Sequence, residues 1–498
     1  MKIGYVTIIS LFLVFAVISG NAYSIVQIKE KKMDENQLIL DDINFLLDNA
    51  NLDIIRPRSS IPVFVERNGS FRVDFNSNIF ENIYLYMSTS YEPIEDRILL
   101  DVESFEKEND GWYAIVKVPF ETPVELYNLT LIILKDDKYY STSRPRAVSI
   151  VDSFDDNFNF VHITDFHVGD PRGFAESIRE TIGYKSVRRC IYEINLLNPD
   201  FVIISGDLVF GQLYPFEYRR EYKKCYDMIQ MFDVPTFLAP GNHDGYRRLG
   251  EDGLEIWQEY FGPLYYSFDY GNYHFLSINS FDWPAEQRWT ISFLSFNWGG
   301  GVGNRQIGWI EQDLKTNDAN LTFMFMHHNP LWDTINDNFL GLHYKNQDIL
   351  LEIIDDYNVD MVLAGHTHID NITIKNDTIF VTTTTPESEI RVDDGYWGYR
   401  LIEIEDGKIK KYNYKEPRFS IPSYKFKVEY NSKYSATVIN DLEMDIEVLL
   451  KFTVPKRPYI IENAVIQYIR EDGILREYYL IVNVAKESNL EANLNYIN

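Results

Sequence analysis

Cysteine is nearly absent from this sequence, because only Cys190 and Cys225 occur among its 498 residues. Two cysteines cannot form a disulfide scaffold, so packing of the chain has to hold the fold together. Both lie in stretches with a helical pattern, where two small buried side chains are expected. A single disulfide between them is the alternative if the protein is exported.

Basic residues are also scarce. The chain has 47 lysines and arginines against 75 aspartates and glutamates, which gives a formal charge of −28. This balance argues against a general binder of nucleic acid or of anionic membranes, because such proteins need clustered positive charge. It does not exclude an enzyme that acts on small phosphorylated substrates, since a bound metal ion can neutralise their charge locally.

Long apolar runs are limited to the N-terminus, where residues 3–28 carry no charge and follow Lys2. Small residues at positions 20, 22 and 24 offer a cleavage site, so we expect an export signal that is removed after about residue 24. An uncleaved membrane anchor is the alternative, because 26 uncharged residues are enough to span a bilayer. In both cases we expect an exported protein, either secreted or held at the cell surface.

The rest of the chain divides by its local patterns. After the signal or anchor at residues 1–24, we expect residues 25–52 to form a helical or linker segment, in which the apolar positions of residues 34–50 recur at helical spacing. Residues 53–150 contain short strands separated by turn residues, which predicts a small antiparallel β-sandwich. Residues 417–498 return to a β pattern and predict a second small all-β domain.

Between these β regions, residues 151–416 alternate apolar strands with helical stretches. This alternation predicts an α/β domain with parallel strands, in which ligands gather outside the carboxyl ends of the strands. All nine histidines lie in this segment, between residues 162 and 368. Five of its apolar strands end in residues able to bind a metal: Asp165 and His167; Asp207; Asn242, His243 and Asp244; His327 and His328; His366 and His368.

The residue types at these strand ends indicate a particular kind of metal site. Carboxylates and neutral imidazoles are ligands of zinc, manganese and iron. About seven candidate ligands are too many for one tetrahedral ion. They suit two ions about 3.5–4 Å apart that share one bridging carboxylate.

In chain order the strand ends read Asp165-Phe-His167, Gly206-Asp207, Gly241-Asn242-His243-Asp244, His327-His328 and Gly365-His366-Thr-His368. This set resembles the calcineurin-like metallophosphoesterases, and the resemblance covers roughly residues 155–415. It implies an α/β fold with a β-sandwich flanked by helices in α/β/β/α layers, and with small all-β domains before and after it. The purple acid phosphatase branch is disfavoured, because Phe210 stands where that branch has a tyrosine ligand.

The resemblance also implies a role for each residue. One ion is held by Asp165, His167 and His368, the other by Asn242, His327 and His366, and Asp207 bridges the two. His243 stays unligated and protonates the leaving oxygen, while Asp244 holds the His243 ring by a hydrogen bond. The double histidine leaves an alternative open: counting from the strand favours His327 as the ligand, whereas an H-x-P pattern favours His328.

The expected function is hydrolysis of a phosphomonoester or phosphodiester by a hydroxide that bridges two ions, with Mn, Zn and Fe as the candidate metals. The expected substrate is a small phosphate ester and not nucleic acid, and membrane contact is expected only through the possible anchor. The alternative function is that of an exported surface protein whose β domains bind a partner and whose metal site is structural.

Several other residues have plainer interpretations. His162 and His274 lie within predicted strands and are expected to be core histidines with satisfied hydrogen bonds. Arg247 and Arg248 follow the third motif, where a solvated charge pair is expected in preference to a grip on substrate phosphate. The aromatic stretch 281–298 either walls the substrate cleft or forms core beneath a long loop.

Overall fold

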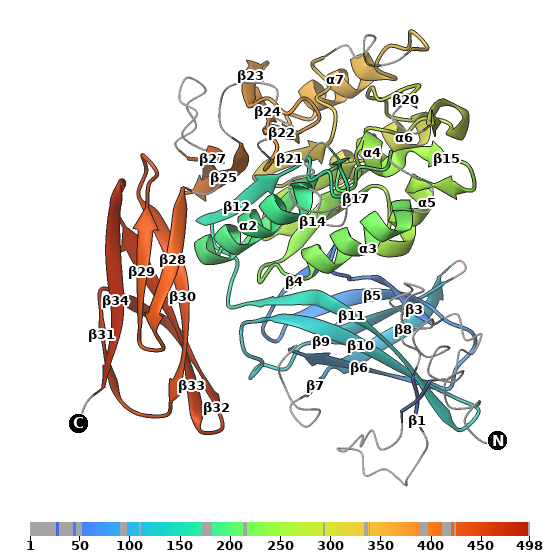
Figure 1. Cartoon of the computed structure of the whole chain (residues 1–498). Coiled ribbons are helices and arrows are strands. Elements are labelled where there is room, and N and C mark those ends of the chain that lie inside the picture. Colours follow the sequence, from blue (N-terminus) through green and yellow to red (C-terminus); the bar gives the residue numbers. More distant parts are fainter. Residues whose placement is uncertain are drawn as a thin grey trace, which may run out of the picture. The chain divides into compact units, whose positions relative to one another are not determined.

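The computed structural model describes most of the chain after residue 51 and two short strands before it. The described residues are 26–28, 43–45, 52–89, 97–108, 111–171, 182–212, 217–291, 294–332, 337, 339–387, 397–410, 420–422 and 425–496. The chain divides into two compact units, the first comprising residues 1–58 and 62–152 and the second residues 59–61 and 153–498 (Figure 1). Within the described ranges no helix is both long and apolar enough to cross a membrane. The predicted export signal at residues 1–24 lies outside these ranges.

The first unit is a β-sandwich. Its larger sheet has the order β2-β1-β11-β10-β6-β7, with β4 paired in parallel to β11, and its smaller sheet has the order β3-β5-β9-β8. Alternate residues of these strands point inward, so residues of β5, β6, β9 and β10 share one apolar core. The strands are β1 (Val26–Ile28), β2 (Ile43–Phe45), β3 (Asp53–Arg56), β4 (Val63–Glu66), β5 (Ser70–Asn76), β6 (Asn82–Ser88), β7 (Ile98–Leu99), β8 (Asp101–Glu108), β9 (Gly111–Lys117), β10 (Leu126–Lys135) and β11 (Lys138–Val151).

The helix predicted before this β-sandwich is wrong for the residues of it that the structure describes. Residues 43–45 lie in the segment predicted to be helical, but they form β2, which pairs antiparallel with β1. A helical pattern of a few turns is only marginally stable by itself, so backbone hydrogen bonds to a neighbouring strand override it. The other residues of the predicted helix lie outside the described ranges.

The second unit contains two sheets packed face to face. The first has the order β14-β13-β12-β25-β26, with β27 paired to β25, and the second has the order β17-β18-β21-β22-β24-β23. Strands β12 to β14 are parallel, as are β18, β21, β22 and β24. Their bounds are β12 (Phe158–Ile163), β13 (Phe201–Ser205), β14 (Thr236–Ala239), β17 (Tyr266–Tyr270), β18 (Tyr273–Ile278), β21 (Leu321–Met326), β22 (Met361–Ala364), β23 (Asn371–Lys375), β24 (Thr378–Thr382), β25 (Gly398–Glu405), β26 (Lys408–Ile409) and β27 (Ser420–Pro422).

Phenylalanines fill the space between these two sheets. The ring of Phe160 stacks on Phe201 with 5.0 Å between centroids, and Phe275 stacks on Phe323 at 4.6 Å. The two stacks meet edge to face, with 5.6 Å between Phe160 and Phe275. Each fully buried phenylalanine stabilises the fold by roughly 1.5–3 kcal/mol. This aromatic layer fixes the distance between the sheets whose strand ends carry the predicted ligands.

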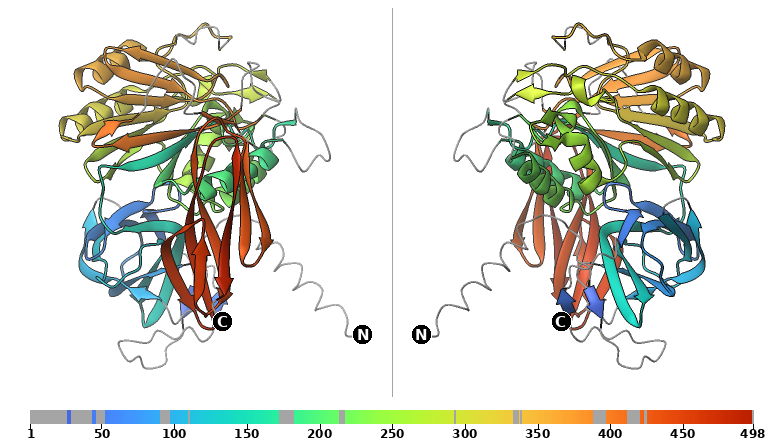
Figure 2. Two further views of the ribbon diagram at one scale, coloured as in Figure 1. Left: turned by 90° about the vertical axis from the view of Figure 1, so that its left-hand side faces the viewer. Right: turned by 90° about the vertical axis from the view of Figure 1, so that its right-hand side faces the viewer.

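Helices cover the outer faces of both sheets. Because side chains alternate along a strand, Val161 and Ile163 of β12 face outward and share a core with α2 and α3, while Met324 and Met326 of β21 do so with α6 and α7. In Figure 2 the green helices α2 and α3 and the yellow to orange helices α6 and α7 lie on opposite sides of the strands. The predicted α/β/β/α layers are therefore confirmed. The helices are α2 (Ile182–Leu197), α3 (Tyr218–Ile229), α4 (Asn242–Gly245), α5 (Gly253–Phe261), α6 (Asn304–Lys315) and α7 (Gln347–Asp356).

The two cysteines lie on these helices. Cys190 of α2 and Cys225 of α3 are both buried and neither forms a disulfide. On α3 the buried residues Tyr218, Tyr222, Cys225 and Ile229 recur every three or four positions, which is why this polar stretch forms an amphipathic helix. The cysteines are therefore the small buried residues that the sequence predicts.

A second β region follows β27 in the same unit. It contains a four-stranded sheet of order β28-β29-β34-β31 and a three-stranded sheet of order β30-β33-β32. The side chain of Arg189 on α2 donates a hydrogen bond to the carbonyl oxygen of Phe426 at its start. The strands are β28 (Phe426–Ser432), β29 (Ser435–Asn440), β30 (Ile446–Pro455), β31 (Tyr459–Glu462), β32 (Val465–Asp472), β33 (Leu475–Val484) and β34 (Ser488–Tyr496).

The two strand histidines have different environments. His162 is fully buried, and its ring nitrogens lie 2.7 Å from the hydroxyls of Thr383 and Ser205, as expected for a core histidine. His274 is instead held between two carboxylates, with Nδ1 at 2.6 Å from Asp269 and Nε2 at 2.7 Å from Asp313. Burial alone lowers the pKa of His274, but the hydrogen bonds to Asp269 and Asp313 outweigh it and raise the pKa to about 9.

This ion pair predicts that stability depends on pH. Because the pKa of His274 rises from 6.5 in the unfolded chain to about 9 in the folded one, its contribution is complete below pH 6.5 and is lost as pH rises through 9. Asp269 is well exposed, so we expect only about 1–2 kcal/mol. Urea unfolding of the wild type and of His274→Gln measures this contribution. Their free energies of unfolding should differ at pH 6 and approach each other at pH 10. An equal difference at both pH values would show that the ion pair does not stabilise the fold.

Candidate metal centre and active site

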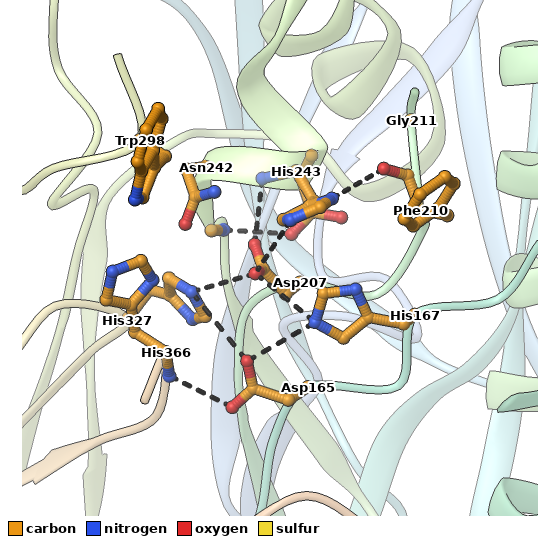
Figure 3. A network of polar contacts seen from close by, with 12 residues as sticks. Asp165, His167, Asp207, Phe210, Gly211, Asn242, His243, Trp298, His327 and His366 are labelled. Carbon is orange, nitrogen blue, oxygen red and sulfur yellow. Dashed lines mark hydrogen bonds and ion pairs between the residues drawn. The ribbon is translucent and has the colours of Figure 1, made fainter. Parts of the chain in front are cut away.

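The predicted ligands follow five strands of the two sheets. Asp165 and His167 follow β12, Asp207 follows β13, Asn242 and His243 begin α4 after β14, His327 and His328 follow β21, and His366 and His368 follow β22. Because these strands are parallel, or lie in sheets packed face to face, their carboxyl ends meet at one edge of the sandwich. Figure 3 shows several of these side chains converging there, among them those of Asp165, Asp207 and His327.

The backbone at these strand ends has an unusual conformation. Five of the predicted ligands have positive φ angles although none is glycine: Asp165 (56°), His167 (48°), Asp207 (52°), His366 (74°) and His368 (57°). A left-handed conformation costs a non-glycine residue roughly 1–3 kcal/mol, and such residues cluster at functional sites. The surrounding fold therefore holds these side chains inward against local preference.

Glycines permit the close approach of the loops. Gly206 has a φ of 91°, and a Cβ atom there would lie 2.6 Å from the backbone nitrogen of Gly241. A Cβ atom on Gly241 would in turn collide with the carboxylate of Asp207. The glycines of the second and third motifs thus bring the loops after β13 and β14 into direct contact.

One group of candidate ligands contains Asp165, His167 and His368. The Oδ1 atom of Asp165 lies 3.2 Å from Nε2 of His368 and 3.6 Å from Nε2 of His167. The two imidazole nitrogens are themselves 3.1 Å apart. A carboxylate and two imidazoles whose donor atoms meet in this way can hold one divalent ion.

Asp207 lies between this group and the second one. Its Oδ2 atom is 3.6 Å from Nε2 of His167 and 3.0 Å from Nε2 of His327. Asn242 approaches from α4, and its amide nitrogen donates to the hydroxyl of Tyr246 at 2.7 Å, which leaves its oxygen for another partner. The ring of His366 lies 5.1 Å from that of His327. Asp207 therefore has the position expected of a carboxylate shared by two ions.

Four buried atoms of this set have no hydrogen-bond partner: Oδ1 of Asp165, Nδ1 of His167, Oδ1 of Asn242 and Nε2 of His327. An unsatisfied buried polar atom costs about 1–3 kcal/mol, so such atoms are rare unless an ion or water satisfies them. The oxygens of Asp165 and Asn242 and Nε2 of His327 are atoms of the kind that bind divalent metals. The residues present therefore fit a dinuclear metal site.

The charges of the site also favour a cation. Burial raises the pKa of Asp165 and of Asp207, but the neighbouring histidines outweigh it and bring both below the ordinary value. Asp207 and Asp165 in turn overcome burial at His327 and raise its pKa to about 9. Both carboxylates are thus ionised at neutral pH, and the site attracts positive charge.

Hydrogen bonds separate the roles of the two adjacent histidines. His327 donates from Nδ1 to the carbonyl oxygen of Ser205 at 2.8 Å, which leaves Nε2 directed at Asp207. Both ring nitrogens of His328 have partners, with Nδ1 at 2.9 Å from the hydroxyl of Ser280 and Nε2 at 2.9 Å from the carbonyl oxygen of Trp298. His328 does lie beside His327 and His366. Its occupied nitrogens nevertheless favour His327 as the ligand.

His243 lies at the wall of the cleft (Figure 3). Its Nδ1 atom donates to the carbonyl oxygen of Phe210 at 2.5 Å, and its backbone N–H donates to Oδ1 of Asp207 at 2.8 Å. Its Nε2 atom lies 3.9 Å from Oδ2 of Asp207. Burial lowers the pKa of His243 to about 3, although Asp207 acts in the opposite direction. With Nδ1 engaged by Phe210, Nε2 is the nitrogen left for a substrate.

The role predicted for Asp244 needs correction. Its carboxylate does not hold the His243 ring; it accepts hydrogen bonds from the backbone N–H groups of Leu208 at 3.0 Å, Val209 at 3.2 Å and Gly241 at 2.8 Å. A carboxylate on the first turn of α4 faces back toward the preceding loops, so it ties the loop after β13 to the loop after β14. The Phe210 carbonyl takes the role expected of Asp244, and the sequence offered no signal for a backbone group.

A cleft of about 660 Å³ opens over the site. Six of the predicted residues line it: His167, Asp207, Asn242, His243, His366 and His368. Gln212, Leu294, Trp298, Asp337 and Phe339 also line it. The aromatic stretch 281–298 serves both predicted purposes, because Trp298 faces the cleft while Phe281 and Trp283 are buried below it. No sequence motif marks Asp337 or Phe339 individually, because loops bring these two residues to the cleft.

The two arginines after His243 do not line the cleft. Arg248 is buried, and its guanidinium lies 5.8 Å from the centre of the Tyr218 ring, so the prediction of a solvated charge pair is wrong for this residue. The Arg247 guanidinium lies over the ring of Trp289 at 5.4 Å. Both cations thus pack against aromatic rings.

Comparison with known proteins agrees with this geometry. Residues 158–370 match a family model described as calcineurin-like phosphoesterase. A probable glycerophosphodiester phosphodiesterase, GpdQ, of Arcobacter nitrofigilis is 25% identical over 236 residues, which cover 47% of this chain and 80% of that protein. A probable cyclic nucleotide phosphodiesterase of Rhodococcus erythropolis is 22% identical over 263 residues, covering 50% of this chain and 80% of that protein. The structure of purple acid phosphatase PPD1 from yellow lupin gives a TM-score of 0.41 at 13% identity, over 74% of this chain and 69% of that one.

Proposed function

We propose that this chain, whose residues 158–370 form a calcineurin-like phosphoesterase domain and which is a hydrolase of phosphoric esters, acts on small phosphodiesters. The observation that carries the proposal is the set of buried, unpaired donor atoms on Asp165, Asn242 and His327, which lie around Asp207, a residue that lines the cleft. Such a set is costly for a purely structural role and suits a site that binds ions and substrate.

Two divalent ions would be held by the seven residues Asp165, His167, His368, Asp207, Asn242, His327 and His366. When bound, such ions act as Lewis acids and lower the pKa of a water molecule toward neutrality. His243 protonates the leaving oxygen from Nε2, because its Nδ1–H is engaged by the carbonyl oxygen of Phe210. The negative charge of a bound substrate beside the ring favours the protonated imidazole that this step requires.

The cleft lining favours a diester over a monoester. Among the described residues that line it there is no lysine or arginine, while Asp337 adds negative charge at its wall. A monoester carries a second negative charge that such a wall repels, whereas a diester carries one. Leu294, Trp298 and Phe339 supply apolar surface for the organic group of a diester. The names of the two phosphodiesterase relatives support the same choice.

A comparison of two chromogenic substrates tests this proposal. With Mn²⁺ or Zn²⁺ added, kcat/KM for bis-p-nitrophenyl phosphate should exceed that for p-nitrophenyl phosphate by about tenfold or more, which corresponds to about 1.4 kcal/mol of discrimination. Asp337→Asn removes one negative charge from the wall of the cleft. It should therefore lower the ratio of kcat/KM for the diester to kcat/KM for the monoester. A higher kcat/KM for the monoester in the wild type would contradict the proposed preference for diesters. If the wild type hydrolyses neither compound, the proposal that it acts on phosphodiesters fails.

We also propose that the protein acts after export, on the basis of the uncharged stretch at residues 3–28. Immunoblotting of the culture medium, membranes and cytoplasm, combined with N-terminal sequencing, would test it. Recovery only in the cytoplasm with an intact N-terminus would contradict export.

A further inference from the structure

A single peptide group connects His243 to a buried carboxylate on another element. The carbonyl oxygen of Phe210 accepts a hydrogen bond from Nδ1 of His243 at 2.5 Å. The N–H of the next residue, Gly211, belongs to the same peptide group and donates to Oε2 of Glu221 at 2.8 Å. Both ends of this peptide are therefore hydrogen-bonded, one to the acid of the proposed reaction and the other to a glutamate in the first turn of α3.

Glu221 is an unusual residue for its position. Only 5% of its surface is exposed, and burial raises the pKa of its carboxyl to about 8, although Gly211 and Arg248 act in the opposite direction. Room for it depends on Gly169, which has a φ of 106° and where any Cβ atom would collide with the Glu221 carboxylate. Burying a carboxylate is costly, and an apolar residue of similar size would serve packing alone. Packing alone therefore does not explain a carboxyl group at this position.

The same helix also anchors the backbone of His243. The hydroxyl of Tyr218 lies within hydrogen-bond distance of two carbonyl oxygens, that of His243 at 2.8 Å and that of Asp244 at 2.7 Å, which share its single proton. Tyr222 donates to the carbonyl oxygen of Asp244 at 2.7 Å. One turn of α3 therefore supports the main chain of His243 through tyrosines and its ring through Glu221.

Gly211 makes this support necessary. Its φ is 64°, and a Cβ atom there would lie 2.5 Å from the His243 carbonyl oxygen and 2.8 Å from the Tyr218 ring, so only glycine fits. A peptide group next to glycine rotates more easily than any other, because glycine tolerates φ angles of both signs. Rotation by half a turn would direct the N–H at His243, and the carbonyl oxygen that fixes the ring would be lost.

We propose that Glu221 is a positioning residue for the reaction: by accepting the Gly211 N–H it locks the Phe210–Gly211 peptide in the orientation whose carbonyl holds the His243 ring. A carbonyl oxygen only accepts hydrogen bonds, so the proton stays on Nδ1 and Nε2 faces the cleft. This inference rests on the proposed function and adds to it the group that orients its general acid.

The test separates leaving groups that need protonation from those that do not. An alkyl alkoxide has to be protonated as it departs, whereas p-nitrophenolate is a stable anion. In Glu221→Leu, kcat for a methyl or glyceryl phosphodiester should fall about 10- to 100-fold, while kcat for bis-p-nitrophenyl phosphate should change less than about threefold. A merely structural role of Glu221 would lower both rates together, and that result would overturn the inference.

Two further variants show whether the hydrogen bond to the Gly211 N–H matters or only the presence of a carboxyl group on α3. Glu221→Gln keeps an oxygen that accepts from Gly211 and should retain turnover of the alkyl ester within about threefold. Glu221→Asp keeps the carboxyl group but is too short to reach the Gly211 N–H, so it should behave like Glu221→Leu. If Glu221→Leu does not fold, Glu221→Gln and Glu221→Asp decide the question. The inference would be contradicted if Glu221→Asp hydrolysed the alkyl phosphodiester at the wild-type rate while Glu221→Gln did not.

A matched control lies on the same helix. Asp227 of α3 is exposed and pairs with Lys223, so Asp227→Asn should leave both rates unchanged. Wild-type hydrolysis of bis-p-nitrophenyl phosphate serves as the reference for the proposed function itself. If the wild type does not hydrolyse it, the proposed function fails; if the wild type does but all Glu221 variants keep equal alkyl turnover, only the role of Glu221 fails.

Discussion

Replacing His243 by alanine should lower kcat for an alkyl phosphodiester by about 10²–10⁴-fold, which is the range that a general acid contributes. The effect on bis-p-nitrophenyl phosphate should be much smaller, because its leaving group departs without a proton. His243 has Nδ1 engaged by Phe210, and seven other residues are proposed to hold the two ions, although His243 also lies within ligand distance of His167 and Asp207. Its backbone N–H, which donates to Asp207, also survives the substitution.

The metal content of His243→Ala should therefore equal that of the wild type, as measured by mass spectrometry of the purified protein. His343 provides the matched control, because it is exposed and does not line the cleft, and His343→Ala should change neither rate. Full activity of His243→Ala on the alkyl ester would show that another group protonates the leaving oxygen. Loss of metal in this variant would instead make His243 a ligand.

Replacing Asp207 by asparagine should have the second large effect. The side chains have nearly the same shape, and the asparagine oxygen can still accept from the His243 backbone. What is lost is the negative charge between His167 and His327, 3.6 Å and 3.0 Å from their Nε2 atoms. We expect weakened binding of both ions and a fall in kcat of at least about 10³-fold, since a shared carboxylate supports both halves of a two-metal site.

Asp165→Asn is the matched comparison for Asp207→Asn. Asp165 is equally buried, but it belongs to the group with His167 and His368. Titration of metal-free protein with Mn²⁺ should show one weakened ion for Asp165→Asn and two for Asp207→Asn. Weakening of a single ion in Asp207→Asn would contradict the bridging role.

His243→Ala and Asp207→Asn together also distinguish an enzyme from the alternative function. An exported surface protein with a structural metal site would lose metal and stability in Asp207→Asn, but it would have no turnover for His243→Ala to remove. Loss of turnover without loss of metal in His243→Ala is therefore expected only if the protein is an enzyme.

The fold and the ligand set could be predicted because both depend on local sequence. Apolar runs such as residues 361–364 mark parallel strands, and a glycine followed by polar residues marks the turn at each strand end. Parallel strands place those ends along one edge, so the approximate meeting of Asp165, Asp207 and His327 follows from topology. Their distances do not, since they depend on the phenylalanine layer between the sheets and on the left-handed turns.

The support of His243 could not be predicted, because two of its parts carry no sequence signal. The Phe210 carbonyl is a backbone group, and Glu221 on α3 resembles any polar residue of an amphipathic helix. The prediction of a helix at residues 43–45 was wrong for a related reason, since pairing with another strand, β1, makes these residues a strand. His274 lies in a strand as predicted, yet its partner Asp313 comes from α6.

The wild-type arm of the metal titration tests the central claim most directly. Metal-free protein is titrated with Mn²⁺, with Zn²⁺ in parallel, while bound metal and hydrolysis of bis-p-nitrophenyl phosphate are recorded on the same samples. The claim predicts two bound ions per chain and turnover that is absent without metal and complete when both are bound. Binding of a single ion at saturation, or equal turnover by the metal-free protein, would contradict it.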